Sequence, residues 1–334
     1  MICRQEAGTV SEIKITGQKR LVIVSGRAHP QLAIDIAAEL ETSIVHTDAR
    51  TFANGEIYAR YDESVRGCDA FVIQSHTDPI NEWLMEQLIM VDALKRASAK
   101  RITVVSPFYP YARQDKKGRG REPISARLIA DLYKAAGADR IMSVDLHAAQ
   151  IQGFFDGPVD HLFAMPVLLA HFQMILDPST LTVVSPDMGR VRVADIWSDK
   201  LGAPLAIIHK RRDPLIPNKV TVHEIVGEVN GRVCLLVDDM IDTGGTIVKA
   251  AEALKAAGAT KVVVAATHAI FSAPASDILQ HASIDSVVVT DTLPIPESKR
   301  FPTLTILPIA PLLARAIHEV FDDGSVTSMF DGAA

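Results

Sequence analysis

Short apolar runs rich in β-branched residues alternate with Ala- and Leu-rich stretches along nearly the whole chain. Continuous apolar runs are typical of strands that are covered on both faces, and the spacers between them have the length of crossover helices. Helices are expected at residues 29–40, with Pro30 in the first turn, and at 243–257, with Gly258 as C-terminal cap. The expected strands are residues 21–26, 70–75, 101–107, 140–145, 181–186, 205–208, 232–239, 261–268 and 286–291. The pattern predicts an α/β protein with parallel sheets.

The length of 334 residues suits two domains, and VVSP occurs at comparable places in the two halves, at 104–107 and 183–186. We therefore expect two similar doubly wound parallel-sheet domains. Glycines and prolines that break regular structure gather in residues 147–165. The boundary is placed there, which gives predicted domains of residues 20–155 and 156–307.

Composition excludes several classes of protein. The chain has 34 basic and 40 acidic residues, a formal charge of −6, so nothing indicates nucleic-acid binding. Its three cysteines are far apart and form no CxxC pair, which favours a reducing compartment over disulfides or zinc. No apolar run approaches the roughly 20 residues that span a bilayer. We expect a cytoplasmic protein without a membrane partner.

The segment VCLLVDDMIDTGGT at 233–246 carries the strongest functional signal. It is predicted to form a buried strand that carries two aspartates near its end, followed by a short loop and the start of a helix. The backbone amides, hydroxyls and glycines of the loop, together with the positive end of the helix, suit a phosphate group. Asp238 and Asp239 stand where they can accept hydrogen bonds from vicinal sugar hydroxyls. A lone DTGGT is equally well a capped helix after a turn, but the preceding strand and double aspartate favour a sugar-phosphate site. The loop residues are Asp242, Thr243, Gly244, Gly245 and Thr246.

This segment resembles the phosphoribosyl-diphosphate-binding motif shared by phosphoribosyltransferases and ribose-phosphate pyrophosphokinases. The resemblance implies domains of phosphoribosyltransferase-like type and a ribose 5-phosphate site at 238–246. Further motifs resemble the pyrophosphokinases specifically, from about residue 20 onward. In that family the C-terminal residues, here 308–330, join the N-terminal domain.

TFANGE at 51–56 is by itself a turn sequence. The matching loop of the family binds the adenine end of ATP from a neighbouring subunit. The resemblance implies that Phe52 stacks on the base, while Asn54, Gly55 and Glu56 complete the contact. Many relatives have Asp where this chain has Asn54, which keeps an acceptor.

SPFYPYARQD at 106–115 follows an expected strand. Arg113 offers a planar fork of donors to phosphate, and Gln114 and Asp115 can orient a nucleotide. The family match assigns Arg113 and Gln114 to ATP binding.

In SVDLHAAQ, His147 matches a histidine that the family places near the magnesium bridging the ATP phosphates, and Asp187 of SPD matches an aspartate near the same ion. Magnesium prefers oxygen ligands, so His147 is the less natural ligand of the two. Many relatives have glycine at the position of Arg190, which leaves the shape of that loop open.

IHKRRDP at 208–214 carries three consecutive cations directly after an expected strand. A solvated charged run is the ordinary explanation. In the family this loop closes over the reacting phosphates, and its catalytic cations match Lys210 and Arg212.

The resemblance implies a ribose-phosphate diphosphokinase that converts ATP and ribose 5-phosphate to AMP and 5-phosphoribosyl 1-diphosphate with Mg²⁺. It further implies a homohexamer, with phosphate and ADP as effectors acting at a site to which residues 324–330 contribute. The alternatives are a phosphoribosyltransferase, which leaves TFANGE and YARQD unexplained, and a non-catalytic regulatory homologue, which would lack cations that this chain retains. A nicotinamide-dependent dehydrogenase is disfavoured because no GxGxxG follows any strand. Residues 1–19 match nothing that can be interpreted.

Overall fold

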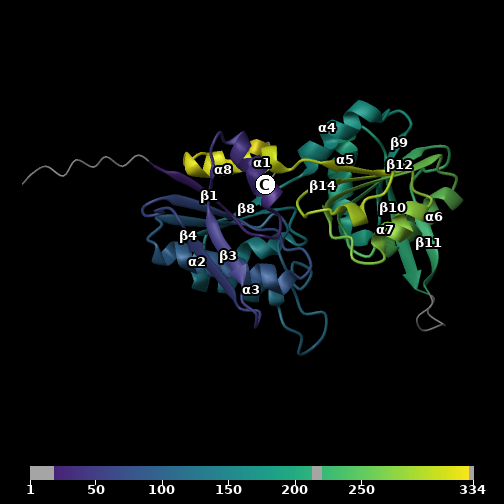
Figure 1. Cartoon of the computed structure of the whole chain (residues 1–334). Coiled ribbons are helices and arrows are strands. Elements are labelled where there is room, and N and C mark those ends of the chain that lie inside the picture. Colours follow the sequence, from purple (N-terminus) through teal and green to yellow (C-terminus); the bar gives the residue numbers. More distant parts are fainter. Residues whose placement is uncertain (1–18, 213–219, 331–334) are drawn as a thin grey trace, which may run out of the picture.

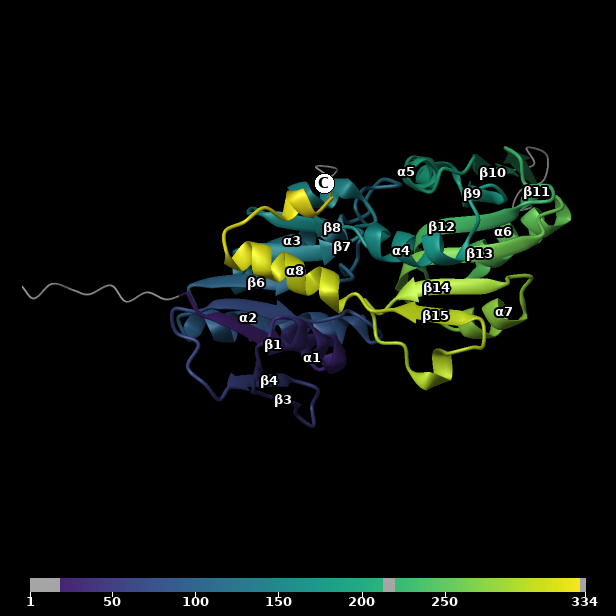
Figure 2. The same cartoon turned by 90° about the horizontal axis from the view of Figure 1, so that it is seen from above.

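A computed structural model describes residues 19–212 and 220–330, without the side chains of 210–212 and 220–223. The chain forms two α/β lobes that lie side by side (Figures 1 and 2). Each lobe is built on one large, mainly parallel sheet. The nine runs expected as strands all fall on strands of these sheets, so the predicted fold class is confirmed.

The first lobe contains a six-stranded parallel sheet in the order β2-β1-β5-β6-β7-β8, which excludes the short antiparallel hairpin of β3 and β4. The central strand β5 is buried at every position because helices cover both faces of the sheet. The strands are β1 (Leu21–Ser25), β2 (Ile44–Val45), β3 (Thr47–Thr51), β4 (Ile57–Tyr61), β5 (Asp69–Ile73), β6 (Arg101–Val105), β7 (Arg140–Val144) and β8 (Val159–Leu162). The helices are α1 (Pro30–Glu39), α2 (Ile80–Arg96), α3 (Ser125–Ala136) and the short η1 (Ala149–Gly153).

The second lobe contains a seven-stranded sheet in the order β11-β10-β9-β12-β13-β14-β15. Six strands are parallel, as expected. The seventh, β11, pairs with β10 in the antiparallel sense, which the sequence did not predict. The strands are β9 (Leu181–Ser185), β10 (Leu205–Arg212), β11 (Val220–Val226), β12 (Val233–Ile241), β13 (Lys261–Ala269), β14 (Ser286–Thr290) and β15 (Leu304–Leu307). The helices are α4 (Met165–Ile175), η2 (Met188–Arg190), α5 (Val191–Leu201), α6 (Gly245–Ala256), α7 (Ala275–His281) and η3 (Glu297–Lys299). Among the described helices of both lobes, none combines the length and the apolar character that crossing a bilayer requires.

The first sheet continues beyond residue 155, where the sequence boundary was placed. Strand β8 lies after that residue and pairs with β7, because the Gly- and Pro-containing stretch before β8 is a turn within the lobe. The last helix, α8 (Ala310–Phe321), packs on α1 of the first lobe, as Figure 2 shows, and η4 (Val326–Phe330) follows it. We therefore propose that the lobes divide after β8 and that 308–330 belong with the first lobe.

Buried contacts join the lobes near the carboxyl ends of their strands. One hydrophobic cluster contains Phe71 of the first lobe and Trp197 of the second. The Thr267 hydroxyl donates to Asp145 at 2.5 Å, and the Ser75 hydroxyl donates to the Thr292 carbonyl at 2.9 Å. Ligands of open α/β sheets bind at carboxyl strand ends, so this junction is where a site made by both lobes is expected.

Candidate active site

The loop at 242–246 connects the end of β12 to the start of α6. Gly244 precedes the helix with φ of 78°, a left-handed conformation that glycine adopts without strain. The first turn of α6 directs backbone N–H groups without intrahelical partners toward the loop. Asp242, Thr243, Gly244 and Thr246 line one cavity, whereas Gly245 is absent from its lining. The local structure is the strand, loop and helix that the sequence predicted.

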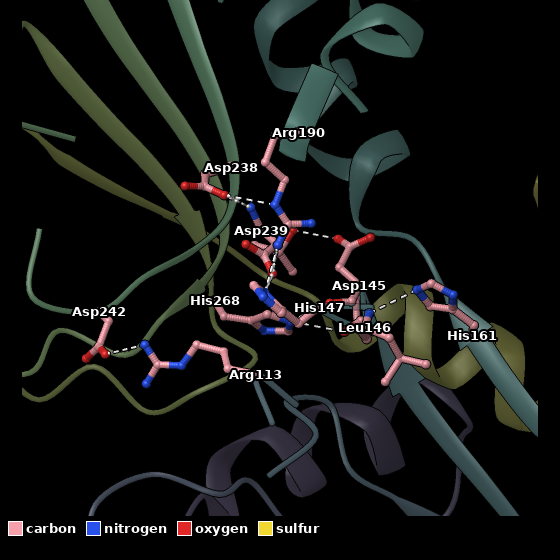
Figure 3. A network of polar contacts seen from close by, with 12 residues as sticks. Arg113, Asp145, Leu146, His147, His161, Arg190, Asp238, Asp239, Asp242 and His268 are labelled. Atoms are coloured by element: carbon pink, nitrogen blue, oxygen red, sulfur yellow. Dashed lines mark hydrogen bonds and ion pairs between the residues drawn. The ribbon is translucent and has the colours of Figure 1, made fainter. Parts of the chain in front are cut away.

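Asp238 and Asp239 line the same cavity near the end of β12. Arg190, from the end of η2, contacts both carboxylates: its Nε lies 3.4 Å from Asp238 Oδ1, and its Nη2 contacts Asp239 Oδ2. His147 Nδ1 lies 2.8 Å from Asp239 Oδ2. Figure 3 shows this group, with Arg190 above the two aspartates and His147 below them.

The pKa values of the two aspartates shift in opposite directions because their surroundings differ. Burial and the charge of Asp239 raise the pKa of Asp238 to about 8. For Asp239, burial acts in the same sense, but hydrogen bonding to His147 and the charge of Arg190 outweigh it and lower its pKa to about 2. The pKa of Asp238 is thus held above that of Asp239, and the positive charge of Arg190 faces both carboxyl groups.

The predicted metal residues His147 and Asp187 come from different lobes and line the same cavity. Asp187 Oδ1 accepts a hydrogen bond from the Gly189 N–H at 2.8 Å, which holds the loop after β9. No three His, Cys, Asp or Glu side chains form a metal-ligand group within the described residues. Mg²⁺ at phosphate sites commonly uses one or two carboxylates together with waters and substrate phosphates. The donor set therefore fits a cation that is held jointly with a polyphosphate.

Three ATP-binding residues are expected at 113–115, and all three are described in the structure. Of these three, Arg113 lines the cavity, whereas the other two do not. Its Nη1 lies 2.7 Å from Asp242 Oδ2, so an expected nucleotide contact meets the phosphate loop of the other lobe (Figure 3). Gln114 instead accepts from the Ser125 hydroxyl at 2.6 Å, and Asp115 is buried and accepts from Gln150. Gln114 and Asp115 thus shape the loop that presents Arg113.

Residues 52–56 form the turn of the β3–β4 hairpin and are exposed. The Phe52 N–H donates to the Glu56 carbonyl at 2.7 Å, and the Asn54 side chain accepts from the Glu56 N–H at 3.2 Å. Gly55 has φ of 91°, which the turn requires. None of these residues is in the described lining of the cavity. The turn predicted from Asn-Gly is present, but within this chain it stands apart from the other site residues.

The backbone of Lys210 and Arg212 extends β10 and pairs with β11, opposite His223 and Val220. These positions therefore lie in a strand hairpin, not in a loop that begins after residue 208 as the sequence indicated. The side chains of both residues lie outside the described part of the chain.

Sequence reasoning did not assign Arg190 or Asp145 to the site. Asp145 directly follows β7 with φ of 40° and is partly buried, and burial raises its pKa to about 6 despite the hydrogen bond from Thr267. Its position directly after a strand was an available signal. For Arg190 the only signal in the sequence was its difference from the glycine of the family motif. No local pattern indicates that this side chain contacts residues of two other segments, at 238–239 and 147.

Fold and cavity together define an α/β protein whose site suits phosphorylated substrates. A sequence model described as the N-terminal domain of ribose phosphate pyrophosphokinase matches residues 21–137, and one described as the phosphoribosyl synthetase-associated domain matches 209–331. Ribose-phosphate pyrophosphokinases of Streptomyces avermitilis and Mycobacterium tuberculosis are similar to the chain. The first is 65% identical over 96% of this chain and 98% of the relative, and the second is 61% identical over 95% and 98%.

Among solved structures, phosphoribosylpyrophosphate synthetase from Mycobacterium smegmatis is similar, with a TM-score of 0.87 and 59% identity over 92% of this chain and 100% of that one. The chain therefore belongs to the ribose-phosphate pyrophosphokinase family and is an enzyme of that class.

Proposed function

We propose that this chain transfers the β,γ-diphosphoryl group of ATP to the anomeric hydroxyl of ribose 5-phosphate, with Mg²⁺, and releases AMP. The observation that carries the proposal is the shared cavity. It brings the 242–246 loop and the Asp238–Asp239 pair together with Arg113 and His147 from the other lobe. One lobe thus offers a sugar-phosphate site, and the other offers groups suited to a polyphosphate.

Alignment and charge neutralisation are the main requirements of such a transfer. The loop amides fix the 5-phosphate, and the Asp238–Asp239 pair accepts hydrogen bonds from the ribose hydroxyls. Arg113 exchanges Asp242 for a phosphate of ATP, with Gln114 and Asp115 supporting its loop. Lys210 and Arg212 offset the charge that grows on the bridging oxygen and on the transferred group. The sugar oxygen bonds to the β-phosphorus as the bond to the AMP oxygen breaks, and the hydroxyl proton passes to solvent.

Magnesium is assigned to His147 and Asp187 together with substrate phosphates. When bound, the cation neutralises phosphate charge. The protein's own part is to hold the Asp187 loop through the Gly189 N–H and the His147 ring through Asp239.

The adenine contact is assigned to Phe52, Asn54, Gly55 and Glu56 from a neighbouring subunit of a homohexamer. The exposure of these residues, with Phe52 46% exposed, supports that assignment because the turn is available to another copy. Phosphate and ADP are proposed effectors. Residues 323–327 after α8 line a hollow together with Arg140, whose guanidinium pairs with Asp160 there, so a bound anion would take the place of that carboxylate. The buried free thiols of Cys68 and Cys234 suit the cytoplasm, where we place the reaction.

The proposal is tested by incubating the full chain with Mg²⁺, ribose 5-phosphate and ATP labelled at the β-phosphorus. We expect label in a 1-diphosphate product and one AMP for each product formed. The matched control is the double variant Asp238→Asn, Asp239→Asn, which keeps side-chain size but removes both charges and should lose the reaction. Absence of AMP with the unaltered chain would refute the proposal, as would transfer that requires a nucleobase and releases diphosphate.

A further inference from the structure

The Arg190 side chain lines the cavity and is largely buried, with 16% of its surface exposed. It extends from the last residue of η2, directly before α5, to residues on β12 and after β7. The long side chain thus links three separate segments. A solvated arginine at a helix start has no need of such contacts, so the placement indicates a role in the site.

The guanidinium divides its donors between two neighbouring carboxylates. Nε faces Oδ1 of Asp238 and Nη2 faces Oδ2 of Asp239. Figure 3 shows the other oxygen of Asp238 directed away from Arg190. A planar fork is suited to hold two acceptors at a fixed separation. Arg190 therefore fixes one oxygen of each aspartate.

The same guanidinium also reaches His147. Arg190 Nη2 and Asp239 Oδ2 both lie 2.8 Å from His147 Nδ1. Because a guanidinium N–H only donates and a carboxylate accepts, one ring nitrogen serves one of these partners at a time. With the proton on Nδ1 the ring donates to Asp239, and Arg190 donates to the same carboxylate. Asp239 is then held from both sides.

We propose that Arg190 is a positioning residue that presents Asp238 and Asp239 to the vicinal hydroxyls of ribose 5-phosphate. The inference rests on the proposed ribose 5-phosphate site and assigns it one more residue. Two adjacent carboxylates repel each other, and a hydroxyl pair needs them at a defined spacing. Arg190 offsets the repulsion and sets the spacing before the sugar arrives.

A positioning role affects the two substrates differently. Loss of Arg190 frees the carboxylates that contact the sugar, whereas Arg113 pairs with Asp242 and the Phe52 hairpin lies outside the described lining of the cavity. Since hydrogen bonds to charged groups contribute about 1.5–3 kcal/mol, Arg190→Ala should raise KM for ribose 5-phosphate about 10- to 150-fold. KM for ATP should change less than about threefold. Arg190→Lys keeps the positive charge but loses the planar fork of donors. Its KM for ribose 5-phosphate should lie between those of the unaltered chain and Arg190→Ala.

The experiment measures both KM values at saturating Mg²⁺ for the full chain, Arg190→Ala, Arg190→Lys and the control Arg96→Ala. Arg96 is an exposed arginine of α2 that pairs with Asp92 on the same helix, so its loss should leave both KM values unchanged. Adding guanidinium chloride to Arg190→Ala should recover part of the ribose 5-phosphate affinity. A merely structural arginine would not be replaced by the free cation. Melting temperatures of all variants are measured alongside.

The outcomes separate this inference from the proposed function. If Asp238→Asn with Asp239→Asn weakens ribose 5-phosphate binding but Arg190→Ala does not, the role of Arg190 is wrong and the sugar site stands. If the aspartate variants bind ribose 5-phosphate normally, the sugar site itself is wrong. Equal increases in both KM values for Arg190→Ala, without rescue by guanidinium, would also overturn the positioning role.

Discussion

The phosphate loop at 242–246 and the hairpin turn at 52–56 differ in how the chain supports them. The loop is fixed at its two ends by β12 and α6, and Arg113 of the other lobe contacts it. The hairpin belongs to a separate two-stranded sheet, and its turn is exposed. One chain therefore brings together most residues of the proposed sugar-phosphate site, whereas the proposed adenine contact faces outward. The proposed sugar-phosphate site can therefore be tested within one chain, whereas the proposed adenine contact has to be tested between subunits.

The strongest test concerns the hairpin of β10 and β11, which β9 separates from β12 and the proposed sugar-phosphate site in the sheet order. Removing the Lys210 charge should lower turnover about 100- to 1000-fold, as the loss of one transition-state donor does. Ribose 5-phosphate binding, measured by calorimetry, should change little. Lys249 is an exposed lysine of α6, so Lys249→Ala provides the matched control. Near-normal turnover of Lys210→Ala would remove this residue from the catalytic group.

The second test asks whether the hairpin serves another subunit. Base stacking on an aromatic ring contributes about 1–3 kcal/mol, so Phe52→Ala should raise KM for ATP roughly 5- to 150-fold and leave KM for ribose 5-phosphate unchanged. Ile34, 50% exposed on α1, offers a control of similar exposure through Ile34→Ala.

Co-expression of Phe52→Ala with Lys210→Ala sharpens this test. A mixed oligomer contains sites with an intact hairpin from one subunit and an intact lysine from the other. Activity should then exceed the sum of the two separate variants. Activity equal to that sum would place the hairpin and the lysine in the same subunit's site.

The sequence predicts a region well when the residues that define it are adjacent in the chain, and poorly when they come from distant segments. The strands of both sheets and the 242–246 loop follow from local runs, because burial on both faces selects continuous apolar segments. Strands β3 and β4 are partly exposed, and the TDART of β3 is mostly polar, so their pattern was weak. Arg190 acquires its contacts only when η2, β12 and the end of β7 meet, and no spacing in the chain records that meeting. The antiparallel β11 likewise became visible only through its pairing with β10.

A third test compares two glycines with left-handed backbone conformation. One lies in the loop proposed to bind phosphate, and the other lies away from it. Gly244 has φ of 78°, and an added Cβ would lie 3.3 Å from Ile278 Cδ1. Gly202 has φ of 62° at the end of α5, with nothing within 4 Å of an added Cβ. Alanine at either position should cost about 1–2 kcal/mol of folding free energy. Only Gly244→Ala should also raise KM for ribose 5-phosphate, by about tenfold. An equal KM for both variants would separate the loop from phosphate binding.

The smallest effect is expected at Arg50, which supports the hairpin from its own strand. Its guanidinium carbon lies 4.8 Å from the Tyr58 ring centroid and 5.9 Å from that of Phe52. Cation–π contacts at exposed sites contribute about 0.5–1 kcal/mol, so Arg50→Met should raise KM for ATP about two- to fivefold by loosening Phe52. Arg50→Lys, which keeps the cation, should fall closer to the unaltered chain. In the Phe52→Ala background the Arg50→Met change should have no further effect, because the ring it orients is gone. A large additional loss in that background would instead mean that Arg50 contacts the nucleotide itself.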